Sequence, residues 1–166
     1  MRRLLLSAAL FALAACGQSE APPPSNGAAT APAPAAQPPA AAGPSAEAIA
    51  AAVAALPAPY NEANYEAGRR VFAQCRSCHT IEAGGPNRVG PNLHGVFGRE
   101  IGTMANFNYS PAVQQADFVW DAERLDHWLD NPQTFLPGNR MAFAGVRNET
   151  QRRDLIAYLM VATAAE

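Results

Sequence analysis

Two cysteines and a histidine occur within five consecutive positions of the stretch QCRSCHT, residues 74–80. Cys75 and Cys78 are separated by two residues, and His79 follows the second cysteine directly. Such a sequence is a candidate dithiol, half of a zinc site or the attachment site of a c-type haem. Residues at i and i+3 near the end of a helix lie on one face, so both thiols can bond to one edge of a flat ligand while the imidazole reaches its centre. This geometry favours haem attachment.

The other two chemistries of this pair have less support in the sequence. A structural zinc site needs four nitrogen or sulfur ligands. Beyond the pair and its adjacent histidine, the chain offers only His94 and His127 and no second Cys-x-x-Cys. An exported dithiol module would need only the two thiols, so it remains an alternative. A visible spectrum recorded after denaturation distinguishes the two, because covalently attached haem stays on the chain.

An iron bound by one histidine has a further coordination position that another side chain can fill. His94 and His127 are candidates, although single histidines are more often structural or exposed. Met160 falls on the apolar stripe of an expected helix, which favours core packing. Met104 in GTMANF and Met141 in PGNRMAFAG both lie in expected loops. The residues around them do not distinguish Met104 from Met141 as the second iron ligand.

The elements that would position these residues are helices at the two ends of the expected folded part. An Asn cap at Asn61, acidic residues and an apolar stripe predict a helix over residues 61–75. Further helices are expected over residues 121–131 and from a cap at Asn148 toward the chain end. The segment between them is rich in Gly, Pro and Asn and has no sustained strand alternation. Two terminal helices around such loops need a large buried group to pack on.

The beginning of the chain has the features of an export signal. Two arginines precede an apolar run over residues 4–15, which is shorter than the roughly 20 residues that cross a bilayer. LAAC, at residues 13–16, resembles the bacterial lipobox, in which cleavage before the cysteine leaves Cys16 to carry lipid. The alternative is an ordinary signal peptide with an incidental Cys16. We expect residues 1–15 to be a signal peptide and the remainder to be exported.

Residues 16–59 are expected to be an Ala/Pro-rich linker, because they contain too little apolar bulk to form a core. Within them, SAEAIAAAVAAL could form a short helix capped by Ser45, but a helix of this length is marginal alone. We therefore assign it to the tether. The folded domain is then expected over residues 60–166.

The charge balance limits the kinds of partner. The chain has 12 basic and 14 acidic residues and a formal net charge of -2. This balance gives no indication of a nucleic-acid partner. All the basic residues are arginines, since the chain contains no lysine.

From Tyr60 to its end the chain resembles the class I, mitochondrial-type cytochromes c. The resemblance is carried by GRRVFAQCRSCHT, GPNLHGVFGR, FNYS, NPQTFLPGNRMAFAG and RRDLIAYL. It implies an all-α fold with the N- and C-terminal helices packed together around one covalently bound haem c. In that arrangement Gly68 and Phe72 pack on Leu155 and Tyr158.

The resemblance also implies a set of site residues. His79 would be the proximal iron ligand and Met141 the distal one, and the Pro91 carbonyl would accept a hydrogen bond from the other ring nitrogen of His79. The positions that match haem propionate contacts in the family are Arg99, Tyr109, Trp120 and Asn139. Trp128 departs from the family, which usually has a tyrosine near the methionine ligand. An indole N–H can only donate a hydrogen bond, so the environment of Met141 would differ.

The function implied is that of a monomeric one-electron carrier of a respiratory chain, not an enzyme. It would take electrons from a quinol:cytochrome c reductase and pass them to a haem-copper terminal oxidase. A haem enzyme such as a peroxidase would instead need an open coordination position. Because the mitochondrial proteins lack the lipobox and linker, we expect a bacterial form on the periplasmic side of a membrane, lipid-anchored at Cys16. The alternative is a soluble periplasmic protein.

Overall fold

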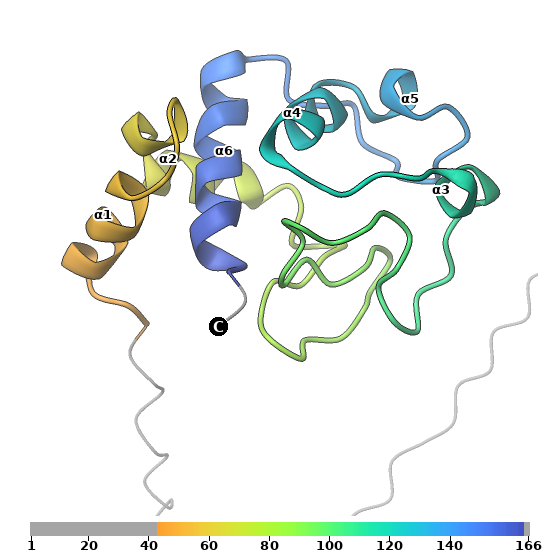
Figure 1. The fold of residues 1–166 in the computed structure, drawn as a ribbon, viewed down its shortest axis with the longest axis horizontal. Helices are drawn as coiled ribbons and strands as arrows, with labels where there is room; N and C mark the ends of the chain where they lie inside the picture. The colour runs from red at the N-terminus through yellow and green to blue at the C-terminus, as the bar shows by residue number, and fades with distance from the viewer. Residues whose placement is uncertain (1–42, 165–166) are drawn as a thin grey trace, which may run out of the picture. The chain divides into compact units, whose positions relative to one another are not determined.

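Short helices joined by long irregular segments make up residues 43–164, the part of the chain that our computed structural model describes (Figure 1). The expected signal peptide, Cys16 and most of the expected linker lie outside these residues. Within them there is no named strand, and a single antiparallel bridge joins Glu100 to Val119. The expected all-α fold class is confirmed.

Each α-helix in this part begins after a polar residue whose side-chain oxygen accepts a hydrogen bond from a backbone N–H of the first turn. The caps are Ser45, Asn64, Ser110, Asp121, Asn131 and Asn148. The helices are α1 (Ala46–Ala54), α2 (Tyr65–Phe72), α3 (Pro111–Gln115), α4 (Ala122–Asp130), α5 (Pro132–Phe135) and α6 (Glu149–Ala162), and the 3-10 helix η1 (Tyr60–Glu62) precedes α2. The helices expected over residues 121–131 and after Asn148 are therefore present as α4 and α6.

The first predicted helix of the domain is shorter than expected. Asn61 is not its cap, because it lies inside η1, and α2 starts only after Asn64. The backbone of Asn64 is extended, its N–H donates to Asp154 Oδ1 at 3.0 Å, and its own Oδ1 accepts from Ala67 N at 2.8 Å. This long-range bond to α6 fixes the start of α2, and the sequence of either segment alone does not reveal it.

The crossing of α2 and α6 forms the centre of the core (Figure 1). Gly68 is needed there, since a Cβ built on it would lie 2.0 Å from the backbone oxygen of Asp154. The rings of Phe72 and Tyr158 lie 5.3 Å apart, and Leu155 of α6 is fully buried. The predicted packing between the two terminal helices is confirmed.

The folded unit extends further toward the N-terminus than the sequence indicated. Helix α1 lies in the segment that we assigned to the linker, yet it packs on η1 and α6 and buries Val53. Packing of an apolar face compensates for the low intrinsic stability of so short a helix. The compact unit thus includes α1 and does not start at Tyr60.

A nearly buried arginine joins α6 to α4. Arg152 has 11% of its side chain exposed and donates to both carboxylate oxygens of Asp126, at 2.7 and 3.1 Å. It also donates to the carbonyl of Val146 at 3.0 Å. The segment before α6 is therefore fixed to two helices.

None of the helices between residues 43 and 164 combines the length and the apolar run that crossing a bilayer requires.

Candidate haem site

A cavity of about 790 Å³ lies between α2, α6 and the long loops. This volume is in the range of cofactor pockets, and most of the lining side chains are apolar. Every residue that we assigned to haem binding lines it: Cys75, Cys78, His79, Pro91, Arg99, Tyr109, Trp120, Trp128, Asn139 and Met141. Residues from distant parts of the sequence thus converge on one space.

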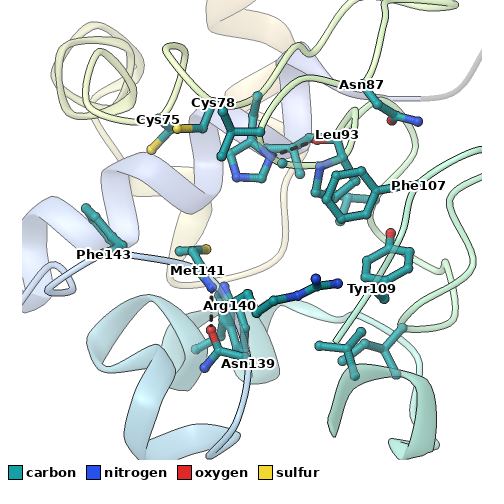
Figure 2. Close-up of a pocket in the computed structure, with 18 of the residues that line it drawn as sticks. Cys75, Cys78, Asn87, Leu93, Phe107, Tyr109, Asn139, Arg140, Met141 and Phe143 are labelled. Carbon is teal, nitrogen blue, oxygen red and sulfur yellow. Dashed lines mark hydrogen bonds between the residues drawn. The ribbon is translucent and has the colours of Figure 1, made fainter. Parts of the chain in front are cut away.

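The two cysteines lie side by side on one wall of the cavity (Figure 2). They follow α2 in a run of turns, in which Cys75 N donates to Phe72 O at 2.8 Å and His79 N donates to Cys75 O at 2.9 Å. They are not joined in a disulfide. Burial, and to a lesser extent the neighbouring Cys78, raises the pKa of Cys75 to about 11. Reactive dithiols need a lowered thiol pKa, so this environment disfavours the dithiol alternative.

His79 is held in one orientation by a backbone carbonyl. Its Nδ1 lies 2.7 Å from Pro91 O, the contact that the resemblance implied. With Nδ1–H donating to that oxygen, Nε2 carries the free lone pair, as a metal-binding imidazole requires. Burial lowers the pKa of His79, while the bond to Pro91 opposes that shift. The neutral imidazole is therefore the favoured form at neutral pH.

Gly90 leaves room for this imidazole. A Cβ at that position would lie 2.3 Å from His79 Cε1 and 2.6 Å from Nε2. Gly90 was not among the predicted site residues. The GP pair that precedes Asn92 was a possible indication, but a glycine next to a proline is also typical of an ordinary turn.

A buried polar network supports the His79 loop, and it too was missed. Asn92, 4% exposed, donates to Thr80 Oγ1 at 2.7 Å and to Glu82 O at 3.0 Å. Thr80 Oγ1 donates in turn to Pro86 O at 2.7 Å, and Leu93 N donates to Thr80 O at 2.8 Å. These bonds tie together the two segments that carry His79 and its carbonyl partner.

Met141 reaches the cavity from the segment after α5, and Figure 2 shows its N–H bonded to Asn139. Met104 does not line the cavity. Met160 lines a separate small hollow at the end of α6. His127 is exposed, and His94 is absent from the cavity lining. Of the candidates for a second iron ligand, only Met141 is in position.

Arg99 and Tyr109 supply polar groups in an otherwise apolar space. The Arg99 guanidinium donates to His94 O at 3.0 Å and to Asn92 O at 3.1 Å. Burial lowers its pKa, with Tyr109 opposing the shift, and burial raises the pKa of Tyr109. An arginine remains charged at neutral pH even so. Arg99 is thus a partly buried cation at the cavity.

Trp120 and Trp128 belong to an aromatic cluster beside the cavity. Their rings meet edge to face with centroids 5.5 Å apart. Trp128 also meets Phe135 of α5 at 5.9 Å, and Trp120 meets Phe118 at 5.0 Å. Such pairs are worth about 0.5–1.5 kcal/mol beyond burial of their area. Packing is therefore part of the role of both tryptophans.

These residues fit a covalently attached haem. Two thiols and an oriented neutral imidazole share one wall, a thioether lines the same space, and a cation is available for the carboxylates of the group. A zinc site of comparable quality is absent from residues 43–164. No three His, Cys, Asp or Glu side chains of this part of the chain lie close enough together to hold a metal.

Comparisons with known proteins agree with this site. The model of the family described as cytochrome c matches residues 65–163. Cytochrome c of Kluyveromyces lactis is 42% identical over 108 residues, which cover 64% of this chain and 98% of that protein. Cytochrome c of Chlamydomonas reinhardtii is 47% identical over 98 residues, 58% of this chain and 88% of that protein. Cytochrome c of Ginkgo biloba is 40% identical over 102 residues, 61% and 90% of the two chains.

The matched region contains both terminal helices, the cysteine pair with its histidine, and every other residue that we assigned to the cavity. Proteins of this family attach haem c covalently and act as electron carriers, not as enzymes. The chain therefore belongs to the cytochrome c family.

Proposed function

We propose that this protein is a membrane-tethered electron carrier of a bacterial respiratory chain, with His79 and Met141 as the two axial ligands of its haem iron. The observation that carries the proposal is that both side chains line the cavity that also holds Cys75 and Cys78. A carrier needs both axial positions filled, because an open position would let other molecules react at the metal. Histidine and methionine together also raise the reduction potential, which suits transfer toward an oxidase.

The protein orients the iron ligands and keeps water away from the haem. When bound, haem supplies an iron that changes its charge by one electron. The Pro91 carbonyl keeps the His79 ring in one orientation, and Gly90 allows its close approach. Apolar side chains on the α2–α6 side, including Phe72, Leu155 and Leu159, limit access of water. Little reorganisation is then needed when the charge changes.

Arg99, Tyr109 and Trp120 are the proposed partners of the haem propionates. All three line the cavity, and Arg99 brings a positive charge. Two of the guanidinium's donors bond to the carbonyls of Asn92 and His94, so the side chain is held in place before any ligand binds. A buried carboxylate needs such donors, since leaving it without them is costly.

The proposed anchor is a lipid on Cys16, and the proposed partners are a quinol:cytochrome c reductase and a haem-copper terminal oxidase. Because α1 belongs to the folded unit, the linker runs from Cys16 to Ser45. A coil of this length spans roughly 30 Å, at about 5 to 6 Å times the square root of the residue number. A tether of this length raises the effective concentration of the haem domain at nearby membrane complexes toward the millimolar range typical of short flexible linkers.

Tethering would offset weak electrostatic steering. The chain has no lysine and a formal net charge of -2, whereas steering of a carrier onto an acidic partner needs a positive surface. We therefore propose that anchoring, more than charge attraction, sustains electron flow.

The test compares oxidase turnover in membranes carrying the full chain with turnover supported by a soluble form that starts at Gly43 and so keeps α1. We expect the anchored form to be faster at equal amounts and nearly insensitive to salt. If the soluble form at micromolar concentration matches it and loses activity steeply with salt, charge steering is the main device and the tethering proposal fails.

The attachment of haem is tested separately. After denaturation and extraction with acidified organic solvent, the visible spectrum of the chain should retain the haem absorption. Loss of all haem into the solvent would overturn covalent attachment through Cys75 and Cys78.

A further inference from the structure

Asn139 lines the cavity, but its amide group is occupied by other parts of the protein. We propose that Asn139 is a positioning residue for Met141 and does not bind a haem propionate, the role that the family resemblance implied. The inference rests on the proposed ligation of iron by Met141.

The hydrogen bonds of Asn139 use its full capacity. Its Nδ2 donates to Pro132 O at 2.8 Å and to Leu136 O at 2.9 Å. Its Oδ1 accepts from Met141 N at 2.9 Å and from Gln133 Nε2 at 3.3 Å. An asparagine amide has two N–H donors and one oxygen with two lone pairs. No donor remains for a carboxylate in the cavity.

The orientation of this amide follows from its surroundings. Two carbonyl oxygens, those of Pro132 and Leu136, face one end of the amide, and the Met141 N–H faces the other. The reversed orientation would place Oδ1 against two acceptors and Nδ2 against a donor. Because Asn139 is only 8% exposed, water cannot readily compensate for such mismatches.

Gln133 provides a second brace from α5. Its Nε2 donates to Met141 O at 3.0 Å as well as to Asn139 Oδ1. The backbone N–H of Met141 is thus held by one side chain and its carbonyl by another. Gly138 makes the tight turn between α5 and this segment with a φ of 86°. The two amides fix the Met141 backbone to α5.

Gln133 is a brace on Met141 that cannot contact a propionate. It is exposed and does not line the cavity, so it has no access to a bound group there. Because it bonds the Met141 carbonyl directly, its removal should loosen Met141 whatever the role of Asn139. A propionate role for Asn139 predicts that Gln133→Ala loosens Met141 and Asn139→Ala does not.

The experiment measures imidazole affinity for the oxidised, haem-loaded protein, because imidazole competes with Met141 for iron. The variants are Asn139→Ala, Gln133→Ala and the double variant, with Thr134→Ala as the matched control on the exposed side of α5. The Met-to-iron charge-transfer band of the unsubstituted protein is recorded first. Its absence would refute ligation by Met141, and with it both the proposed function and this inference.

We expect Asn139→Ala to tighten imidazole binding roughly tenfold or more, because it leaves the Met141 N–H without its partner and removes two of the bonds that hold this segment to α5. Gln133→Ala should tighten it about two- to fivefold, since its bonds are more exposed. The double variant should show less than the product of the two effects, because the two amides share one network. Thr134→Ala should leave the affinity unchanged.

Two results would overturn the inference while leaving ligation by Met141 intact. One is a charge-transfer band in the unsubstituted protein together with unchanged imidazole affinity in both Asn139→Ala and Gln133→Ala. The other is an Asn139→Ala variant that alters the pH dependence of the reduction potential but not the imidazole affinity, as loss of a propionate contact would. If Asn139→Ala fails to fold, Asn139→Ser takes its place: its shorter side chain loses the bonds to Pro132 and Leu136, so the inference predicts tighter imidazole binding and a propionate contact does not.

Discussion

The two walls of the cavity that carry the proposed iron ligands are built differently. The His79 wall, residues 75–93, is crossed by backbone bonds, from Gly90 N to Cys78 O and from Leu93 N to Thr80 O, and also by the buried side-chain network of Asn92 and Thr80. In the Met141 wall, residues 131–147, the backbone of Met141 itself is held mainly by the side chains of Asn139 and Gln133. The first wall also continues directly from α2, which crosses α6 in the core.

This difference predicts different mobility. A segment that is cross-bonded through buried groups and continues into the main core opens only with much of the fold, whereas one whose ligand residue is held by two side chains, one of them exposed, can open locally. The His79 wall should therefore determine whether haem is held, and the Met141 wall should determine how firmly the distal position is occupied. Substitutions on the His79 wall should change the haem content and the stability of the fold, whereas substitutions on the Met141 wall should change the affinity of competing ligands for the iron.

The largest effect is expected for Gly90→Ala on the His79 wall. The added Cβ would lie 2.3 Å from the imidazole, which would force His79 out of its place. We expect a loss of stability of about 2–3 kcal/mol, the upper part of the range for overpacking, together with low haem content. Chemical denaturation and the haem-to-protein absorbance ratio measure the two. The control is Ala83→Ser, which also adds one heavy atom but at an exposed position outside the cavity lining, and equal effects of both substitutions would contradict the steric argument.

Arg152→Ala tests the far end of the Met141 wall. It would leave Asp126 and the Val146 carbonyl without their partner, at a cost of about 2 kcal/mol, below the range for a fully buried ion pair because the Asp126 side chain is 29% exposed. Denaturant unfolding measures this loss. The exposed pair of Arg69 and Glu66 serves as the comparison, and Arg69→Ala should reduce the stability much less, because solvent screens an exposed pair. If the two arginine substitutions destabilise the protein equally, Arg152 does not connect the wall to the core.

A smaller effect is expected for Trp128→Tyr, which restores the residue type usual in the family. A hydroxyl near Met141 can accept as well as donate a hydrogen bond, unlike the indole N–H. We expect the reduction potential to shift by tens of millivolts, since a one-electron couple converts about 60 mV into 1.4 kcal/mol. Redox titration measures it. An unchanged potential with an unchanged charge-transfer band would mean that Trp128 acts only through packing on Trp120 and Phe135.

All the residues assigned to the site from the sequence and the family resemblance line the cavity, but the sequence does not predict how they are supported. Cys75, Cys78 and His79 are contiguous, so their chemistry can be recognised without a structure. Gly90 and Asn92 act only through residues that the fold brings close, and no local pattern marks them.

The helices differ in the same way, because some follow from their local sequence and others depend on distant contacts. Asn148 lies directly before a long run without Gly or Pro, and the start of α6 was predicted correctly. The start of α2 depends on the bond from Asn64 to Asp154, ninety positions away, and was predicted three residues too early. Helix α1 was assigned to the linker because a helix of its length is marginal alone. Its stability comes from packing on α6 and η1, which its own sequence does not reveal.

The most direct test of the whole account is the Met-to-iron charge-transfer band in the oxidised protein, compared between Met141→Ala and Met104→Ala. Met141 lines the cavity and Met104 does not. We predict that the band is present in the unsubstituted protein and in Met104→Ala and is lost in Met141→Ala. A band that persists without Met141, or that disappears without Met104, would contradict the proposed ligation.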